Sequence, residues 1–198
     1  MLDYTGERLS KKSVLLIGGA RSGKSRFAQE LASRLGEPVL FVATAEAGDE
    51  EMRQRIEEHK RGRSADWNTL EVATHISSHI EQKIGGARTV IVDCITLLVS
   101  NVLGQYSHQA DEQIEVPLIE REVAGEIGEL VGCIDRVDAS FIIVTNEVGL
   151  GLVPADKPSR LYRDLLGKAN QMLAESADEV YLMVAGLPVP IKPAEHPG

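Results

Sequence analysis

A glycine-rich stretch near the N-terminus has the residue types and spacing needed to bind phosphate. The stretch Gly18-Gly19-Ala20-Arg21-Ser22-Gly23-Lys24-Ser25 follows the pattern G-x-x-x-x-G-K-[ST]. Its glycines allow main-chain N–H groups to approach an anion closely. The Lys24 ammonium would reach the β- and γ-phosphates of a nucleoside triphosphate, and the Ser25 hydroxyl would bind Mg²⁺. The stretch therefore predicts a nucleotide site in which Lys24 is a catalytic group.

The sequence on either side of this stretch supports the prediction. Before it, residues 14–17 form a short apolar run that is typical of a buried strand. After it, residues 24–35 carry apolar side chains at helical spacing and stop before Gly36 and Pro38. The stretch would then lie between a strand and a helix N-terminus, where free N–H groups and the helix dipole favour an anion. A chance match in a glycine-rich turn is the alternative, and it explains neither flank.

Four further apolar runs of strand length follow, with helical stretches between them. They cover residues 39–42, 89–92, 141–144 and 180–184. Strands that are apolar throughout are covered on both faces, and their alternation with helices predicts a three-layer α/β fold with a mostly parallel sheet. Ligands of such sheets bind beyond the carboxyl ends of the strands. The positions to examine are therefore Ala43–Ala45, Asp93 and Thr145–Glu147.

Composition limits the remaining possibilities. The chain has 198 residues, 43% of them hydrophobic, and a net charge of −9. These values predict one globular domain over residues 14–192, with tails at 1–13 and 193–198, and they argue against a general nucleic-acid or membrane binder. Cys94 and Cys133 lack metal-type spacing and are expected to be reduced core residues of a cytoplasmic protein. No apolar run is long enough to span a membrane.

Two carboxylates and one histidine stand out along the chain. Asp93 ends an apolar strand and would help hold Mg²⁺ through water, unless it caps the following helix. His59 is expected near the end of a helix, beside the basic cluster Lys60–Arg63; from the residues alone, a histidine satisfied by a carbonyl is the commoner arrangement. Asp93, Glu147 and Glu71 are all eligible as a general base.

Two weaker patterns allow both a ligand and an ordinary surface. Glu71, His75 and His79 recur every fourth residue, which would place them on one helix face; a metal site is possible, but a solvated face is much commoner. Arg160 and Arg163 lie near the start of a helix expected over residues 159–174. A bound anion could compensate for them there, and surface arginines are the alternative.

Taken together, these segments resemble one family closely, the bifunctional adenosylcobinamide kinase / adenosylcobinamide-phosphate guanylyltransferases of cobalamin synthesis. The shared segments are GGARSGKS from Gly18, ATA from Ala43, EMRQRIEEHKRGR with the later Trp67, VDCITLLVSN from Val92, TNEVGLGLVP from Thr145, RLYRDLLGKANQ and ADEVYLMVAGLP. The resemblance covers about residues 14–192. The segment 105–138 matches poorly.

This resemblance implies two reactions and a set of contacts. The enzyme would phosphorylate adenosylcobinamide with ATP or GTP, and then transfer GMP from GTP through a histidine that matches His59. The implied nucleotide contacts are Gly18, Gly19, Ala20, Arg21, Ser22, Gly23, Lys24, Ser25, Ala43, Thr44, Ala45, Lys60, Arg61, Gly62, Arg63, Glu71 and Asp93, with Mg²⁺ at Ser25 and Asp93. The family also implies a RecA-like fold of the phosphate-loop class and a homotrimer. A small-molecule kinase in which His59 is structural and a non-catalytic nucleotide switch are the alternatives; no Asn-Lys-x-Asp guanine motif supports the switch.

Overall fold

The structure is a computed structural model that describes residues 11–45, 53–54, 57, 60, 64–106 and 116–193. Its strands are β1 (Ser13–Gly18), β2 (Val39–Ala43), β3 (Asn68–Glu71), β4 (Thr89–Asp93), β5 (Ser140–Asn146), β6 (Glu179–Val184) and β7 (Leu187–Lys192). Its helices are α1 (Lys24–Leu35), α3 (Ile76–Lys83), α4 (Ile95–Gly104), α5 (Val116–Arg136) and α6 (Lys157–Ser176). The helix expected to end at Gly62 falls mostly outside the described residues.

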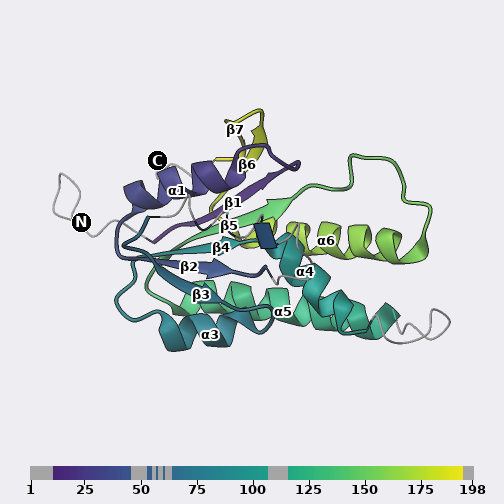
Figure 1. Cartoon of the computed structure of the whole chain (residues 1–198), viewed down its shortest axis with the longest axis horizontal. Helices are drawn as coiled ribbons and strands as arrows, with labels where there is room; N and C mark the ends of the chain where they lie inside the picture. The colour runs from purple at the N-terminus through teal and green to yellow at the C-terminus, as the bar shows by residue number, and fades with distance from the viewer. Residues whose placement is uncertain are drawn as a thin grey trace.

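The strands form a single sheet in the order β3-β2-β4-β5-β1-β6-β7 (Figure 1). Every neighbouring pair is parallel except β6 and β7. The strand β5 lies between β1, which leads into the glycine-rich loop, and β4, which ends in Asp93. The predicted α/β fold with a mostly parallel sheet is confirmed.

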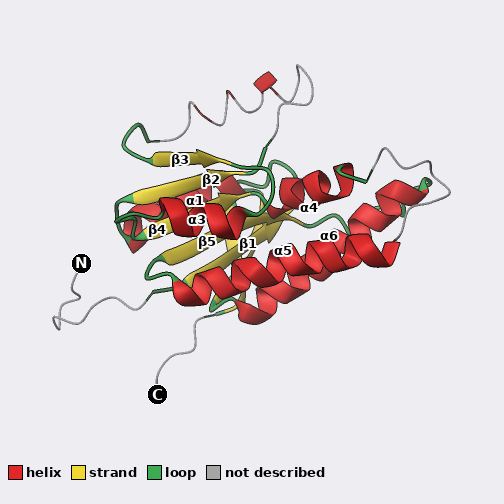
Figure 2. Ribbon diagram, turned by 90° about the horizontal axis from the view of Figure 1, so that it is seen from below, coloured by secondary structure: helices red, strands yellow, loops and turns green. Residues whose placement is uncertain are grey.

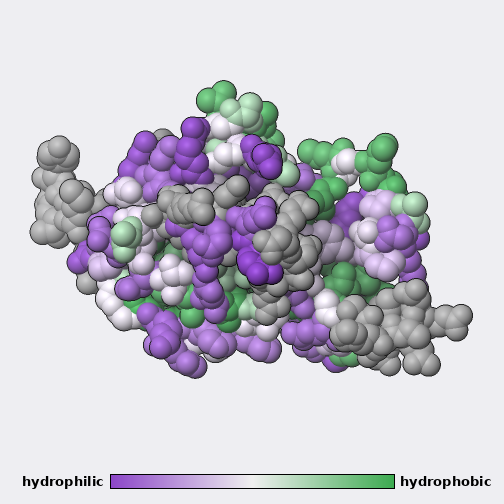
Figure 3. All heavy atoms as spheres, in the orientation of Figure 1, coloured by the Kyte–Doolittle hydropathy of each residue, from purple (hydrophilic) through white to green (hydrophobic). Residues whose placement is uncertain are grey.

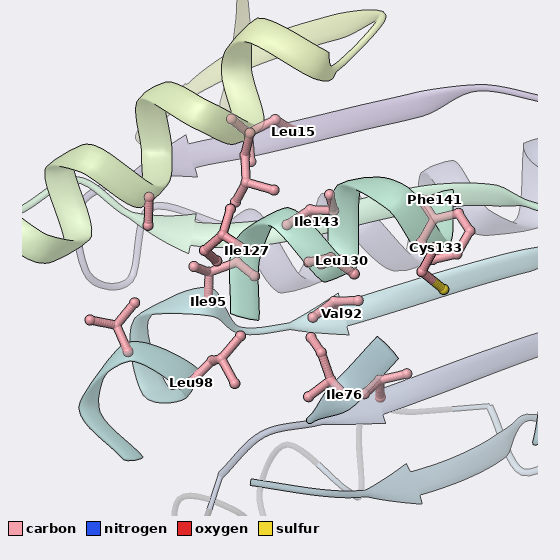
Figure 4. Packing of buried hydrophobic residues seen from close by; sticks show 14 of the residues in the cluster. Leu15, Ile76, Val92, Ile95, Leu98, Ile127, Leu130, Cys133, Phe141 and Ile143 are labelled. Carbon is pink, nitrogen blue, oxygen red and sulfur yellow. The ribbon is translucent and has the colours of Figure 1, made fainter. Parts of the chain in front are cut away.

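Alternate residues of each central strand face opposite sides of the sheet, because side chains in a strand alternate. On β1, Leu15 belongs to the larger core, while Val14 and Leu16 belong to the smaller one. The smaller core lies under α1, and the larger one lies under α3, α4, α5 and α6 (Figure 2). Figure 4 shows the larger core around Leu130. Helices on both faces explain why these strands are apolar throughout.

Two strands were not anticipated from the sequence. The edge strand β3 has the sequence NTLE and is mostly exposed, so it lacks the apolar run of a buried strand. The strand β7 contains Pro188 and Pro190, which are tolerated because it is also an edge strand. A tight turn joins β6 to β7, with positive φ at Ala185 and Gly186.

The ends of the expected helices agree closely with the structure. The helix predicted over residues 24–35 is α1, and the one predicted over 159–174 is α6, which begins two residues earlier with Pro158 in its first turn. Within the described part of the chain, none of the helices combines the length and the apolar character that a membrane crossing needs. The division into one domain and two tails stays a prediction.

Candidate active site

The glycine-rich loop connects the end of β1 to the start of α1. A Cβ atom on Gly18 would lie 2.6 Å from the Met183 carbonyl oxygen, so β6 leaves no room for a side chain there. Gly23 has φ +95°, and a Cβ on it would lie 2.9 Å from the Gly186 Cα. Gly23 is also the N-cap of α1. These two glycines are therefore required by the close approach of strand β6 and the β6–β7 turn to the loop.

Lys24 is buried, and its ammonium lies inside the loop. It donates hydrogen bonds to the carbonyl oxygens of Gly18, at 3.0 Å, and Gly19, at 2.7 Å. The Gly186 N–H donates to the Ser22 carbonyl at 2.9 Å, which ties the loop to the β6–β7 turn. Outside this ring, Gly19, Ala20 and Arg21 are exposed and Ser25 is half-buried. The loop is held from behind while its outer residues remain open to a ligand.

Three neighbouring strands end side by side next to the loop. Ala43 at the end of β2 is opposite Glu71 of β3 on one side and Asp93 of β4 on the other. Helix α4 has Cys94 as its N-cap and no side-chain cap hydrogen bond, so the alternative of Asp93 as its cap is wrong. The sheet thus brings Asp93 and Glu71 to the same edge as the loop.

Thr44 ties the ends of β2 and β4 together. Its side chain donates to the Cys94 carbonyl at 2.7 Å and accepts from the Cys94 N–H at 2.9 Å. Asn101 of α4 donates to the carbonyls of Thr44, at 2.8 Å, and Ala73, at 3.0 Å. Burial, and secondarily the Asp93 carboxylate, raise the pKa of Cys94 to about 11. Thr44 is fully buried and Ala45 half-buried, so Thr44 is a positioning residue for Asp93.

A second network fixes the end of β5 beside the loop. The Asn146 N–H donates to the Thr96 hydroxyl at 2.8 Å, and Tyr162 donates to the Thr96 carbonyl at 3.1 Å. Asn170 of α6 donates to the Asn146 carbonyl at 3.0 Å. Burial raises the pKa of Tyr162 to about 12, which keeps it a donor. Sequence reasoning missed Thr96 and Asn170, since nothing in a lone polar residue within an amphipathic helix indicates its distant partner.

The Glu147 backbone follows this network directly. Its N–H donates to the Gly18 carbonyl at 3.1 Å, so the loop after β5 begins against the glycine-rich loop. The Glu147 side chain accepts a hydrogen bond from the Gly149 N–H. This contact turns the carboxylate toward its own loop.

Lys60 is the member of the basic cluster that the structure places. Its ammonium lies 2.7 Å from the Glu71 carboxylate and 3.8 Å from that of Glu57. Because Glu71 ends β3, this ion pair places the Lys60 ammonium at the carboxyl edge of the sheet. His59, Arg61, Gly62 and Arg63 lie outside the described residues.

The prediction that Glu71, His75 and His79 lie on one helix face is wrong. Glu71 belongs to β3, His75 is the N-cap of α3 with φ 54°, and only His79 is helical. His75 lies 3.5 Å from the buried Glu126 carboxylate, which also accepts from the Ile76 N–H. The polar edge strand β3 therefore replaces the helical pattern that the spacing suggested.

Arg160 and Arg163 have partners within the chain. The Arg160 guanidinium donates to the carbonyls of Pro154 and Ala155, at the end of the loop before α6. Arg163 lies 3.6 Å from Asp164. These contacts support the surface alternative over a bound anion. At the same helix start, the Ser159 hydrogen bonds lower the pKa of Asp156, the N-cap residue.

The oxygen atoms at this edge suit Mg²⁺ as a partner of a bound nucleotide. The Ser25 hydroxyl is half-buried at the second position of α1, and the Asp93 carboxylate is half-buried at the end of β4. Mg²⁺ takes one or two protein oxygens together with phosphate oxygens and water, so it does not need a dedicated cage. Among the described residues, no group of three or more His, Cys, Asp or Glu could hold a metal ion.

The fold and the glycine-rich loop define an α/β protein of the phosphate-loop class. The family model described as cobinamide kinase / cobinamide phosphate guanyltransferase matches residues 14–191, and the chain belongs to this family.

Three curated relatives are similar over almost their full length. Two are named bifunctional adenosylcobalamin biosynthesis protein CobU: that of Escherichia coli K12 is 39% identical and that of Salmonella typhimurium LT2 is 41% identical, each over 90% of this chain and 99% of the relative. The third, from Pseudomonas aeruginosa PAO1, is named CobP and is 40% identical over 90% of this chain and 96% of its own. Among solved structures, the RadB recombinase has a TM-score of 0.49 at 15% identity, covering 90% of this chain and 76% of its own.

Proposed function

We propose that this protein is a bifunctional transferase of cobalamin biosynthesis. It phosphorylates adenosylcobinamide with ATP or GTP, and then transfers GMP from GTP onto the resulting phosphate to give adenosylcobinamide-GDP. The observation that carries the proposal is the shared sheet edge. The Lys24 loop, Asp93 and the Lys60–Glu71 pair all lie at the carboxyl edge of one parallel sheet, at the ends of β1, β4 and β3.

In the kinase step, the aminopropanol hydroxyl of adenosylcobinamide attacks the γ-phosphorus of ATP or GTP. The nucleoside diphosphate leaves, and the hydroxyl proton passes to a base. The N–H groups from Gly18 to Ser25 hold the phosphates, and Lys24 leaves its loop carbonyls to neutralise charge on them. Ser25 and Asp93 would hold Mg²⁺, which supplies further charge neutralisation. Asp93, Glu71 and Glu147 are the candidate bases; Glu147 already accepts from Gly149 and Glu71 is paired with Lys60, so Asp93 is better placed.

In the guanylyl step, an imidazole nitrogen of His59 attacks the α-phosphorus of GTP and pyrophosphate leaves. The phosphate of adenosylcobinamide phosphate then attacks the same phosphorus and releases the histidine. A covalent intermediate divides one transfer into two easier ones. The cluster Lys60–Arg63 stabilises the charge on the transferring phosphates. The position of Lys60 against Glu71 supports placing His59 near the nucleotide.

The remaining assignments follow from the family. We assign the protein to the cytoplasm, where ATP and GTP are made, and to a homotrimer. Ala43, Thr44, Ala45 and Glu71 would line the nucleotide, with Thr44 acting through the backbone geometry that it fixes.

Two labels test the proposal in one experiment. The protein is incubated with adenosylcobinamide, Mg²⁺ and GTP labelled on either the α- or the γ-phosphate. The γ-label is expected in adenosylcobinamide phosphate, and the α-label is expected on denatured protein and then in the corrinoid product. Release of GDP at a rate independent of corrinoid, with no labelled corrinoid, would reject the proposal in favour of a nucleotide switch. Transfer of the γ-label alone would reduce it to a small-molecule kinase.

A further inference from the structure

Exposed apolar side chains gather at two places on one side of the molecule (Figure 3). One is the loop patch, formed by Leu150, Leu152 and Val153 between β5 and α6, with exposed fractions of 88%, 97% and 67%. The other is the β7 patch, formed by Leu187, Val189 and Ile191. Contiguous exposed apolar side chains of this kind indicate an interaction surface.

The loop patch belongs to a segment that is fastened at both ends. At its start, Gly149 donates to the Glu147 carboxylate. At its end, Arg160 donates to the carbonyls of Pro154 and Ala155. Val148 packs against the larger core, whereas the leucines that follow face solvent. The apolar side chains are thus presented outward by an anchored loop.

The loop that carries this patch begins with a hydrogen bond to the phosphate-binding loop. The Glu147 N–H donates to the Gly18 carbonyl at 3.1 Å. Leu150 is three residues further along, so its Cα lies at most about 11 Å from that of Glu147. A bulky substrate whose hydroxyl reaches the γ-phosphate would therefore extend over the loop patch.

We propose that the loop patch is the docking surface for the corrin macrocycle of adenosylcobinamide. This inference rests on the proposed function, and it adds the part of the site that binds the second substrate. The periphery of a corrin ring carries many methyl groups between its amide side chains. Leu150, Leu152 and Val153 cover these methyl groups and hold the aminopropanol arm toward Lys24.

The β7 patch also begins beside the phosphate-binding loop, because the Gly186 N–H donates to the Ser22 carbonyl, but the strand then runs away from it. The strand β7 leaves the turn at Gly186 and runs antiparallel to β6, so that Lys192 lies opposite Val180. Its apolar side chains therefore lead away from the carboxyl edge at which the phosphates bind. Only the loop patch stays beyond that edge along its whole length.

The test compares the double variant Leu150→Ser/Leu152→Ser with Ile191→Ser, a smaller loss of exposed apolar surface at a separate place, on β7. Equilibrium dialysis measures the binding of adenosylcobinamide by its visible absorbance, in the presence of a non-hydrolysable ATP analogue. The double variant is expected to raise the dissociation constant of the corrinoid about tenfold or more. The affinity for the ATP analogue should change less than about twofold in both variants, because the substituted side chains are exposed and lie outside residues 18–25. Ile191→Ser should bind the corrinoid as the unmodified protein does.

Three results would contradict either the docking surface or the proposed function. An unchanged corrinoid dissociation constant in the double variant overturns the docking surface. A lowered sedimentation coefficient in that variant also overturns it, because the patch then joins two copies of the chain. If the unmodified protein binds the ATP analogue but no adenosylcobinamide, the proposed function itself fails.

Discussion

The Lys60 ammonium lies 2.7 Å from the Glu71 carboxylate at the end of β3. Both side chains are partly exposed, so the pair contributes little to stability. The main effect of this ion pair is to fix where the two side chains lie. It places the Lys60 ammonium at the edge of the sheet where Asp93 and the phosphate-binding loop also lie.

We predict that Lys24→Ala abolishes both reactions. The variant loses the only ammonium held within the loop among the described residues, and with it the point charge that faces the β- and γ-phosphates. The expected fall in kcat/KM is about a hundredfold or more. Arg34→Ala, an exposed change at the other end of α1, is the control and should leave both activities unaltered. Near-normal kinase turnover in Lys24→Ala would reject the assigned loop.

Asp93→Asn is expected to impair Mg²⁺-dependent turnover more than nucleotide binding. The carboxylate ends β4 without capping α4, so its replacement removes charge and keeps the shape. Kinase turnover should fall about a hundredfold, and saturation should require more Mg²⁺. Titration of Mg²⁺ at saturating ATP checks this prediction. Equal losses of binding and turnover, with a lowered melting temperature, would assign Asp93 a structural role.

The local and the buried parts of this fold could be predicted from the sequence. The loop at Gly18, its helix and five apolar strands follow from patterns within about ten residues. Glu71 shows where such patterns fail. Its spacing to His75 suggested a helix, but β2 offers a free edge, and Asn68–Glu71 pair with it despite their polarity. Edge strands carry little apolar signal of their own.

The polar contacts between elements were beyond sequence reasoning for a different reason. Thr44 and Cys94 are 50 residues apart, and their hydrogen bonds exist only because β2 and β4 are neighbours. The same holds for Thr96, which meets Asn146 across the sheet edge. The strand ends could be proposed as the site, but the residues that hold them together required the topology.

Thr44→Val tests the fastening of β2 to β4. Valine keeps the shape but leaves the N–H and carbonyl of Cys94 without the hydroxyl that pairs them. Losing these buried partners should lower the free energy of unfolding by about 2 kcal/mol or more. Urea unfolding measures the change. Thr69→Val, at an exposed position of β3, is the control and should stay within about 0.5 kcal/mol. Equal changes in the free energy of unfolding for the two substitutions would show that the Thr44 hydroxyl does not stabilise the contact between β2 and β4.

The two thiols give a pH dependence whose sign is fixed by their surroundings. Burial raises the pKa of both Cys94 and Cys133 to about 11 from an ordinary value of 9.0. Unfolded thiols ionise first, so their contribution to stability is fully present below pH 9 and is lost as the pH rises toward 11. Unfolding curves measured from pH 8 to pH 11 should show this decline. Cys133→Ala should make the slope above pH 9 smaller; an unaltered slope would contradict the prediction.

The last prediction concerns the protonation of His59, since only a neutral imidazole attacks phosphorus. Like charges oppose protonation, so the basic cluster beside His59 should keep it neutral, while Glu71 partly cancels Lys60. Arg63→Ala should therefore move the acid limb of guanylylation to higher pH, and Glu71→Gln should move it to lower pH. The measurement is the amount of acid-labile, alkali-stable GMP on the protein across pH. The quantity compared between variants is the pH at which labelling falls to half on the acid side, not the maximum amount of label.

His59→Ala should acquire no such label and should still phosphorylate adenosylcobinamide, since the kinase step uses the Lys24 loop. If His59→Ala acquires acid-labile GMP at the normal rate, another nucleophile carries the reaction; if the two charge variants move the limb in the same direction, the cluster does not set the protonation of His59.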